Sequence, residues 1–508
     1  MSDPDDKKPT ISQWFREREV FVTGGTGFMG KVLVAKLLLS CPDIRAIHIL
    51  IREKKGVTPK TRLTSLLQQA PFRQLREKYP ERLKKLVVVS GDTTRDGLGI
   101  KEEDAEILKK NVTVIVNMAA NVRFDLPLKT AVNINTKSAF NVIAFAKQCK
   151  QVESFVHVST AYCHCEEPVL EERYYPSGES AEEIMQIVNE IPDAKLEILT
   201  PKILGSQPNT YAFTKGLSED LVYKSGLPAG IARPSIVIGS YKEPDYGWVD
   251  NTNGPTGLMI GAGKGVIRSM LCDGSHRLDV IPCDMAVNAT IALVCNVGLQ
   301  KPQTPIFVNL TESGENPITW EYAIETGKKH IIANPFSGPL WYPGGGITSS
   351  RILHGLAVLF LHILPAYTLD IFIMLTGNKP FLVRVQAKVA YGLSLVQYYT
   401  TKTWYFRNDG LKALRESLSP EDKRTFFMDI REIVWDDYML SYILATRKYC
   451  LKEDPLTLPK ARRVFAYLYV LDIAVKVIFA MLFVWFIYSW CVPQKATIGA
   501  TPEPSFLI

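Results

Sequence analysis

A glycine-rich turn between a short apolar run and a helical pattern constrains the fold more than any other feature. The run Glu19–Thr23 leads into TGGTGFMG, with glycines spaced G-x-x-G-x-x-G, and helical periodicity follows over Gly27–Leu39. Glycine permits a tight turn and close approach of a pyrophosphate, and the helix that follows offers free N–H groups and its positive dipole end. The alternative is a glycine-rich turn without a ligand. The strand before it and the helix after it favour a dinucleotide site, with these contributors: Thr23, Gly24, Gly27, Phe28 and Gly30.

Apolar, β-branched runs alternate with helical patterns over roughly the first 300 residues. Such runs are typical of strands that are buried on both faces of a parallel sheet. The expected strands are Glu19–Thr23, Ala46–Ile51, Leu86–Ser90, Val112–Asn117, Ser154–Ser159 and Ile231–Ile238. Helical periodicity lies between them, notably over Gly27–Leu39 and Lys129–Lys150. The pattern predicts an α/β fold with a Rossmann-like, doubly wound parallel sheet.

The C-terminal part has a different pattern. Pro335–Gly346 is rich in proline and glycine and is typical of a linker, and helical patterns dominate from there to Pro455. We therefore expect a nucleotide-binding domain over 15–335, a helical domain over 347–455 and an anchor over 468–492. The very apolar stretch 352–376 could span a membrane, lie in its surface or form a helical core. Its proline and two histidines favour the last two.

The segment Leu468–Val492 is almost wholly apolar and is long enough to span a bilayer. Asp472 and Lys476 interrupt it, but on a helix they are one turn apart and can pair near the interface. Lys460, Arg462 and Arg463 flank its N-terminal side, which predicts a single-pass C-terminal anchor with the main body facing the cytosol. Such an anchor fits the endoplasmic reticulum or the peroxisome. A buried core helix is the alternative.

Composition argues against other classes of function. The net charge of +7 is spread over 59 basic and 52 acidic residues, with no basic run interleaved with aromatics, so we expect no nucleic-acid partner. Nine cysteines without paired spacing indicate reduced thiols. Cys163-His164-Cys165 has no second ligand pair at a suitable distance, so no metal is expected. The polar N-terminus, Met1–Pro9, does not have the pattern of a signal peptide.

The end of the second expected strand indicates the cofactor. Arg52 stands where an acidic residue would bind the ribose 2′-OH of NAD, and an arginine there can hold the 2′-phosphate of NADP. Lys54, Lys55 and Arg62 add positive charge, while Glu53 is a complication. Asp92, after the third strand, is placed either to meet the adenine or to cap a turn.

Two residue pairs predict proton transfer to a reduced carbonyl. Tyr211 and Lys215 are four apart, on one face of an expected helix. A free tyrosine, with a pKa near 10, is a poor acid at neutral pH, and a neighbouring ammonium would lower that pKa. Ser159 and Thr160 end the fifth expected strand, where a hydroxyl could complete an oxyanion clamp. Alone the Tyr-Lys spacing is weak; after a glycine turn, with the hydroxyl pair between, it is strong.

The order of these motifs resembles the extended short-chain dehydrogenase/reductases, and more narrowly the eukaryotic fatty acyl-CoA reductases. The motifs are TGGTGFMG, the Gly-Asp pair ending at Asp92, NMAANVRFD from Asn117, HVSTAY from His157, YAFTK from Tyr211 and RPSIV, which contains Pro234. The stretch 247–265 and the terminal apolar helix fit the narrower family.

This resemblance implies catalysis by Thr160, with Ser159 less favoured, together with Tyr211 and Lys215. It also implies an oxidoreductase of lipid metabolism that makes fatty alcohol, a wax precursor, from long-chain acyl-CoA with two NADPH and release of CoA. Pro234 joins the expected cofactor residues through its motif. Gly261–Gly265 is expected to be a loop near the acyl or CoA site, where Lys264 and Arg268 meet phosphates or solvent.

Three competing interpretations remain open. Another extended reductase, for a sterol or a sugar nucleotide, would share the glycine turn and the Tyr-Lys pair but leaves the apolar C-terminal region unexplained. A non-catalytic membrane lipid-binding protein would not need Thr160, Tyr211 and Lys215 together. A soluble aldehyde reductase would carry the apolar tail by chance.

Overall fold

A seven-stranded parallel sheet forms the centre of the computed structural model, which describes residues 8–491. The strand order is β11-β7-β5-β4-β1-β2-β3, and all six neighbouring pairs are parallel. The strands are β1 (Glu19–Thr23), β2 (Ala46–Ile51), β3 (Leu86–Ser90), β4 (Val114–Asn117), β5 (Ser154–Val158), β7 (Ala229–Pro234) and β11 (Ile306–Leu310). The chain reverses direction across the sheet between β1 and β4, which opens a ligand crevice at their carboxyl ends. The predicted Rossmann-like fold is confirmed.

Two details of the sheet differ from the expectation. The expected strand Ile231–Ile238 divides at Ser235 into β7 and β8 (Ile236–Ile238), and β8 leaves the sheet to pair with β10 (Val280–Pro282). β11 was not expected, because its short run IFVNL is interrupted by Asn309. That asparagine is buried, and its side-chain amide donates to the carbonyl oxygens of Leu170 and Arg407.

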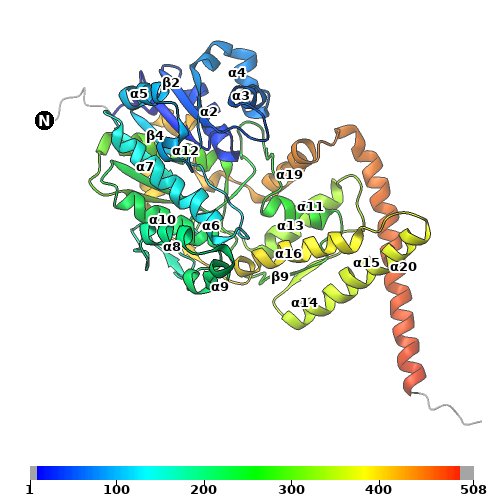
Figure 1. The fold of residues 1–508 in the computed structure, drawn as a ribbon. Coiled ribbons are helices and arrows are strands. Elements are labelled where there is room, and N and C mark those ends of the chain that lie inside the picture. The colour runs from blue at the N-terminus through cyan, green and yellow to red at the C-terminus, as the bar shows by residue number, and fades with distance from the viewer. Residues whose placement is uncertain (1–7, 492–508) are drawn as a thin grey trace, which may run out of the picture.

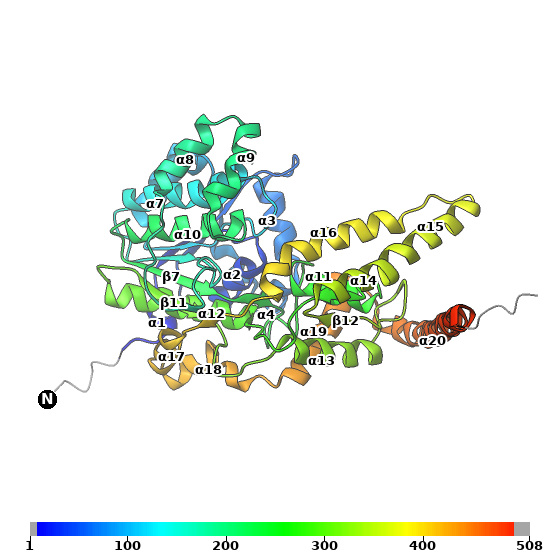
Figure 2. The same cartoon turned by 90° about the horizontal axis from the view of Figure 1, so that it is seen from below.

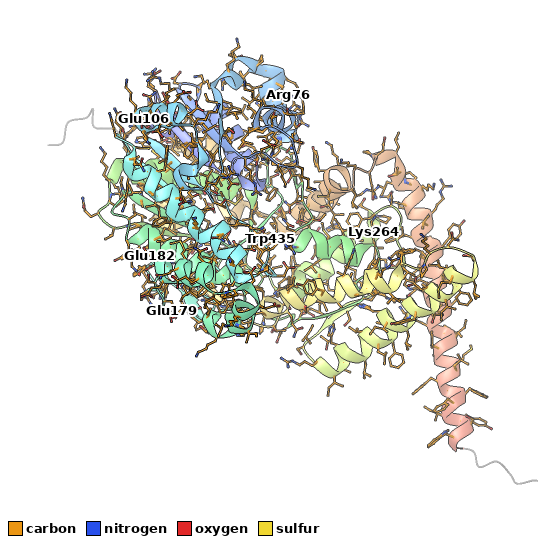
Figure 3. All side chains as sticks on the ribbon, in the orientation of Figure 1. Arg76, Glu106, Glu179, Glu182, Lys264 and Trp435 are labelled. Carbon is orange, nitrogen blue, oxygen red and sulfur yellow. The ribbon has the colours of Figure 1, made fainter. Side chains whose placement is uncertain are left out.

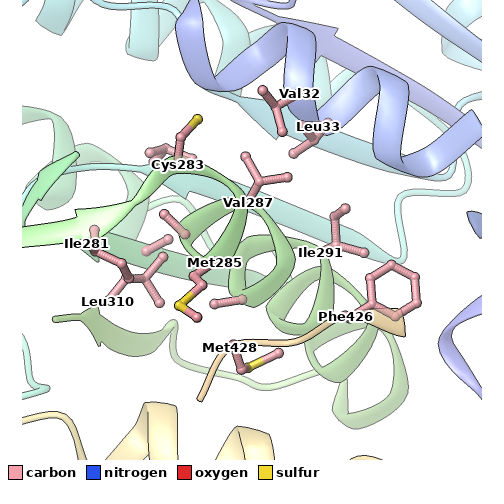
Figure 4. Packing of buried hydrophobic residues seen from close by; sticks show 14 of the residues in the cluster. Val32, Leu33, Ile281, Cys283, Met285, Val287, Ile291, Leu310, Phe426 and Met428 are labelled. Atoms are coloured by element: carbon pink, nitrogen blue, oxygen red, sulfur yellow. The ribbon is translucent and has the colours of Figure 1, made fainter. Parts of the chain in front are cut away.

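Helices cover both faces of the sheet (Figure 1). On one face α2 (Phe28–Ser40) packs against α12 (Cys283–Gln300) through side chains that Figure 4 shows in close view, including Val32, Leu33 and Val287. On the other face lie α5 (Glu102–Asn111), α7 (Ser138–Gln148), α8 (Ala181–Glu190) and α10 (Thr210–Tyr223). α12 is apolar enough to cross a membrane, but it is almost wholly buried here and is a core helix.

The chain after residue 400 returns to the same core. β13 (Tyr405–Phe406) pairs with β6 (Val169–Leu170), and α17 (Asp409–Glu416) packs on β11. α19 (Trp435–Ala445) packs against α13 (Trp320–Ala333), and its Tyr442 hydroxyl bonds with Thr256 of α11 (Pro255–Gly263) at 2.6 Å. The expected loop at Gly261–Gly265 is thus wrong for its first three residues, which continue α11. The domain limits 15–335, 347–455 and 468–492 remain a prediction.

Two elements project from this body (Figures 1 and 2). One is a hairpin in which α14 (Arg351–Val358), a π-helical turn (Leu359–Ile363) and α15 (Leu364–Leu375) lead out and α16 (Leu382–Thr400) returns. The other is α20 (Leu458–Cys491), whose outer side chains stand clear of the body in Figure 3. Both Arg351–Leu375 and Pro455–Trp490 are long and apolar enough to cross a membrane, and both are mostly exposed. A helical core over 352–376 and a buried core helix at the C-terminus are therefore both wrong. Val492, the expected end of the anchor, lies outside the described residues.

The smaller elements connect these parts. The remaining α-helices are α1 (Ile11–Trp14), α3 (Pro59–Leu67), α4 (Arg73–Lys78), α6 (Leu128–Ala131), α9 (Asp193–Leu204) and α18 (Pro420–Thr425), and β9 (Ser269–Leu271) pairs with β12 (Gly346–Thr348).

Candidate active site

The glycine turn has the geometry of a phosphate-binding loop. Gly24 has φ +71°, and a Cβ on it would lie 2.8 Å from the backbone nitrogen of Ala119. A Cβ on Gly30 would overlap the carbonyl oxygen of Gly24, so α2 can start this close to the turn only with glycine there. Gly27 is the N-cap of α2 and makes no side-chain cap, which leaves the first N–H groups of the helix open. These residues fit a nicotinamide dinucleotide.

Thr23 and Phe28 support the turn from two sides. The Thr23 hydroxyl is buried, donates to Asn117 Oδ1 at 2.6 Å, and accepts from the N–H groups of Met118 and Ala119 at 3.2 Å each. It joins the turn to the end of β4. The Phe28 ring stacks on Trp248 with centroids 5.4 Å apart. That stacking places the loop before α11 against the start of α2.

Two guanidinium groups lie at the end of β2. Arg52 is about half exposed, and its Nη1 is 3.9 Å from Asp92. Arg62 reaches back from α3, donating to the Arg52 carbonyl oxygen at 2.5 Å and to Thr26 Oγ1 at 3.4 Å. Burial and the like charge of Arg52 lower the pKa of Arg62. Cations gathered beside the glycine turn fit an anionic group there. The Asp92 carboxylate accepts from the N–H and hydroxyl of Thr94, so it also caps a turn.

Tyr211 lies in the first turn of α10, which Asn209 caps by accepting from the N–H of Ala212 at 2.9 Å. Burial raises the pKa of Tyr211, and a hydrogen bond with the Thr160 hydroxyl acts in the opposite direction. Thr160 Oγ1 also donates to the carbonyl oxygen of Pro234 at 3.5 Å. Ser159 Oγ is buried without a partner within residues 8–491. The structure thus joins Thr160, not Ser159, to the tyrosine.

Lys215 lies deeper than the sequence suggested. Its ammonium donates to the Val158 carbonyl oxygen at 2.7 Å and lies 3.1 Å from His157 Nε2. Within residues 8–491 it makes no hydrogen bond to the Tyr211 phenol, so the ammonium contact expected to lower the tyrosine pKa is not made. Burial lowers the pKa of Lys215 to about 8.

A buried polar chain continues from Lys215 to the glycine turn. His157 Nδ1 is 3.0 Å from Asn117 Nδ2, and the other end of that amide bonds to Thr23. Burial, with the nearby lysine charge, holds the pKa of His157 well below its usual range, so the ring is neutral. Sequence reasoning missed this role for Asn117 and His157. The available signal was a polar residue within each of two apolar strands, VIVN and SFVHV.

Cys163 and His164 have a third neighbour, Glu219, with ligand atoms all within 4.8 Å. Spacing could not reveal this contact, since Glu219 comes from α10. The Glu219 carboxylate accepts from Arg233 through both oxygens, at 2.5 to 3.2 Å, and from the Cys163 thiol at 3.2 Å. A guanidinium thus already balances this carboxylate. That the protein holds no metal remains a prediction.

Comparisons with known proteins agree with this geometry. A family model described as male sterility protein, of the NAD-binding kind, matches residues 22–290, and a second male sterility model matches 361–453. "Fatty acyl-CoA reductase 1" of Gallus gallus is 36% identical over 89% of this chain and 88% of that protein. "Fatty acyl-CoA reductase wat" of Drosophila melanogaster is 33% identical over 96% of this chain and 95% of that protein.

Solved structures share the fold at low identity. The terminal R domain of the myxalamid PKS-NRPS pathway has a TM-score of 0.56 at 16% identity, covering 86% of this chain and 93% of that one. The reductase domain of a Mycobacterium tuberculosis non-ribosomal peptide synthetase has a TM-score of 0.55 at 15% identity, covering 87% and 93%.

Proposed function

The chain belongs to the fatty acyl-CoA reductase family, and from that premise we propose that it reduces long-chain acyl-CoA to a primary fatty alcohol and releases CoA. It is a nicotinamide-dependent oxidoreductase with a Rossmann-like fold. The observation that carries the proposal is the Tyr211–Thr160 hydroxyl pair at the carboxyl ends of β5 and β7, on the same side of the sheet as the glycine turn. A proton donor and a cofactor site meet there.

NADPH is the proposed cofactor, and when bound it would supply a hydride to the carbonyl carbon in each of two rounds. Arg52 and Arg62 would hold its 2′-phosphate, and the open N–H groups at the start of α2 its pyrophosphate. Gly24, Gly27 and Gly30 leave room for that approach, while Thr23, Phe28, Asp92 and Pro234 shape the site.

The chain's own groups would manage the protons and the oxyanion. In the first round the carbonyl oxygen of the thioester becomes a hemithioacetal oxyanion, which Thr160 would stabilise and Tyr211 protonate. Breaking the C–S bond then releases CoA as its thiol and leaves the aldehyde. Tyr211 would take up a proton from solvent between the rounds, and in the second round it would protonate the alkoxide to give the alcohol. Within residues 8–491 the Lys215 ammonium makes no hydrogen bond to the phenol, so it would stabilise the developing phenolate only through its charge at longer range.

An apolar cavity of about 180 Å³ is our candidate for the distal acyl chain. α11, α13, α19 and the β9–β12 pair surround it, and Leu258, Met259, Trp320, Ile331 and Met439 are among its lining residues. Apolar walls with few polar groups suit a hydrocarbon chain.

We also propose that α20 is a membrane anchor and that the body faces the cytosol, at the endoplasmic reticulum or the peroxisome. The flanking charges of Lys460, Arg462 and Arg463 support this orientation.

The deciding test is NADPH oxidation by detergent-solubilised protein with palmitoyl-CoA, with products identified by gas chromatography. Fatty alcohol, with two NADPH consumed per CoA released, is the expected result. NADPH binding without consumption of acyl-CoA would contradict the proposal and favour a non-catalytic lipid-binding role. Reduction of a different carbonyl substrate would favour another extended reductase.

A further inference from the structure

The α14–α16 hairpin exposes an apolar surface that water would not favour. Between Arg351 and Lys379 the sequence contains one charged residue, Asp370. Large apolar side chains stand exposed along the outgoing arm, including Ile352 at 77%, Phe360 at 59%, Phe372 at 60% and Leu375 at 78%. A continuous apolar face of this kind on a projecting element indicates an interaction surface.

The polar side chains of the same arm have protein partners. Asp370 accepts from the N–H groups of Phe381, Leu382 and Val383 at 2.9 Å each, so it closes the hairpin tip. His362 Nε2 accepts from the Arg268 N–H at 2.9 Å, and His354 Nδ1 bonds to Ser269 Oγ at 2.8 Å.

Two threonine hydroxyls of this stretch also have internal partners. Thr368 Oγ1 donates to the Leu364 carbonyl oxygen at 2.9 Å, and Thr376 Oγ1 donates to the Ile373 carbonyl oxygen at 2.7 Å. The remaining hydroxyl belongs to Tyr367, a residue type that is enriched at membrane interfaces. Water would satisfy such groups without any partner, whereas hydrocarbon requires internal partners. The occupant that fits both the apolar face and the paired polar groups is lipid.

One residue of the body, Arg268, contacts both the hairpin and α20. The backbone N–H of Arg268 bonds to His362 of the hairpin, and its guanidinium pairs with Asp472 of α20 at 3.1 Å. The two apolar elements therefore leave the body close together, and Figure 2 shows them on the same side of it. A bilayer that holds α20 thus also meets the hairpin.

The positions of charged residues argue against a complete crossing of the membrane by the hairpin. Lys379 lies at the tip, and Arg384 and Lys388 are exposed on the returning helix α16. Crossing would carry these cations through the hydrocarbon, where charged side chains are strongly disfavoured. Lying in the interface, they would reach the headgroups. We propose that the α14–α16 hairpin embeds in the leaflet facing the body, as a monotopic membrane element beside α20.

The returning arm connects this surface to the candidate active site. Tyr399, near the end of α16, accepts a hydrogen bond from Asn209, the N-cap of α10, at 2.8 Å. Its ring is 5.2 Å from that of Phe124, which is 5.8 Å from the ring of Tyr211. Through these rings, α16 links the hairpin to the wall of the candidate active site. This step rests on the proposed function; the membrane contact itself does not.

Lipid-borne photolabelling of the full-length protein tests the contact directly. The protein is reconstituted in phosphatidylcholine vesicles that contain a diazirine-bearing phospholipid, irradiated, and mapped by peptide mass spectrometry. Adducts in 352–375 as well as in α20 are the expected result. Adducts in α20 alone would overturn the proposal. So would crosslinks between two copies through 352–375 without lipid adducts, since a second copy would then cover this face.

A double variant provides the matched comparison. Phe360→Glu with Phe372→Glu places charge on the exposed face, and Ile107→Glu makes the same change at a residue of α5 that is 54% exposed. The double variant should lose most hairpin adducts and turn over vesicle-borne acyl-CoA several-fold more slowly, while a short, water-soluble acyl-CoA reacts as before. Ile107→Glu should behave like the parent, and unchanged hairpin adducts in the double variant would refute the contact. If the proposed function is wrong, the result will differ: the parent protein will react with neither acyl-CoA substrate, yet its hairpin adducts will remain.

Discussion

His157 couples the charge on Lys215 to the orientation of Asn117. A neutral imidazole carries one N–H. If the Lys215 ammonium donates to Nε2, the proton must reside on Nδ1, and Asn117 must then turn its amide oxygen toward the ring. If Lys215 is neutral, Nε2–H can donate to it and Asn117 can present its NH₂ group, as the distances to Nδ1 and to Thr23 allow. The protonation state of Lys215 thus determines which end of the Asn117 amide faces Thr23 at the glycine turn.

This coupling predicts a specific pH dependence. The Lys215 ammonium is charged below its pKa of about 8 and neutral above it, so kcat/KM should fall as pH rises through about 8. This fall is the descending limb of the pH profile. His157→Leu removes a hydrogen-bond acceptor from the ammonium, which disfavours the charged form of Lys215. The limb should therefore move to lower pH by about one unit, the equivalent of one charge-assisted hydrogen bond. The measurement is kcat/KM for acyl-CoA across pH.

Two variants act as controls for this prediction. His157→Gln retains an acceptor oxygen and should leave the limb near its parent position. Lys215→Arg replaces the titrating group with one that stays charged, so the limb should vanish from the residual activity. A limb that stays near pH 8 in His157→Leu would show that the imidazole does not set the lysine pKa.

Loss of the Tyr211 hydroxyl should abolish most turnover while cofactor binding remains. Proton transfer by a positioned side chain contributes on the order of 10² to 10⁴ in rate, so Tyr211→Phe should slow kcat by that range. NADPH affinity, measured by fluorescence titration, should change little. Tyr223→Phe removes a hydroxyl from the other end of α10 and serves as the control. Full activity in Tyr211→Phe would remove the tyrosine from the mechanism.

Arg52 should discriminate between the two nicotinamide cofactors. Arg52→Ala removes a guanidinium beside the glycine turn, and charged hydrogen bonds contribute roughly 1.5 to 3 kcal/mol, so NADPH affinity should fall about 10- to 100-fold. NADH affinity should barely change. Arg45→Ala, which removes an exposed arginine paired with Glu19 at the other end of β2, should affect neither. Equal losses for NADPH and NADH in Arg52→Ala would exclude a 2′-phosphate contact.

At the scale of elements, the sequence predicts strands and helices that follow a local pattern. It misses features that depend on contacts between residues far apart in the chain. The predicted bounds of β1, β2 and β3 agree with the structure, because each is a mostly apolar run of the kind that forms a strand in a parallel sheet. The depth of Lys215 could not be predicted, since its partners lie on β5 and not on its own helix. The Cys163–Glu219 contact was hidden for the same reason.

The hairpin shows the same limit of prediction from sequence. Its apolar composition was evident over 352–376, but composition cannot distinguish a core helix from a lipid-facing one. The difference depends on whether other elements cover it, and the fold leaves it uncovered.

The cavity between α11 and α13 should set the acyl chain length. Gly327 lines this cavity, and a Cβ built on it meets no atom within 4 Å, so a side chain can enter without distorting α13. Gly327→Leu should therefore lower kcat/KM for long-chain acyl-CoA more than for short-chain acyl-CoA. Glu325→Leu, on the exposed face of the same helix, is the control. A uniform loss across chain lengths would place the acyl chain elsewhere.

At the scale of the whole molecule, the first part of α20 packs on the body before the helix projects outward. Phe465, in its second turn, is buried with Ile331, Phe336 and Ile443. Two turns later Asp472 accepts from Arg268 and from the Trp341 indole N–H at 2.6 Å. With α20 as the proposed anchor, these contacts would set the angle at which the body meets the membrane, and Arg268 would link them to the hairpin.

Asp472 has a second ion-pair partner, Lys476. We expect Asp472 to stabilise the packing of α20 on the body far more than Lys476 does. Asp472→Ala leaves the Arg268 guanidinium, 11% exposed, and the Trp341 N–H without their acceptor, and removing one member of a buried pair costs about 3 to 5 kcal/mol. Lys476 is 61% exposed, so Lys476→Ala should cost about 0 to 1 kcal/mol. In detergent, Asp472→Ala should lower the thermal unfolding midpoint and speed proteolysis between α19 and α20, whereas Lys476→Ala should resemble the parent. If the two variants behaved alike, the anchor would be held by Phe465 and its neighbours alone, and the hairpin and α20 would not be coupled through Arg268.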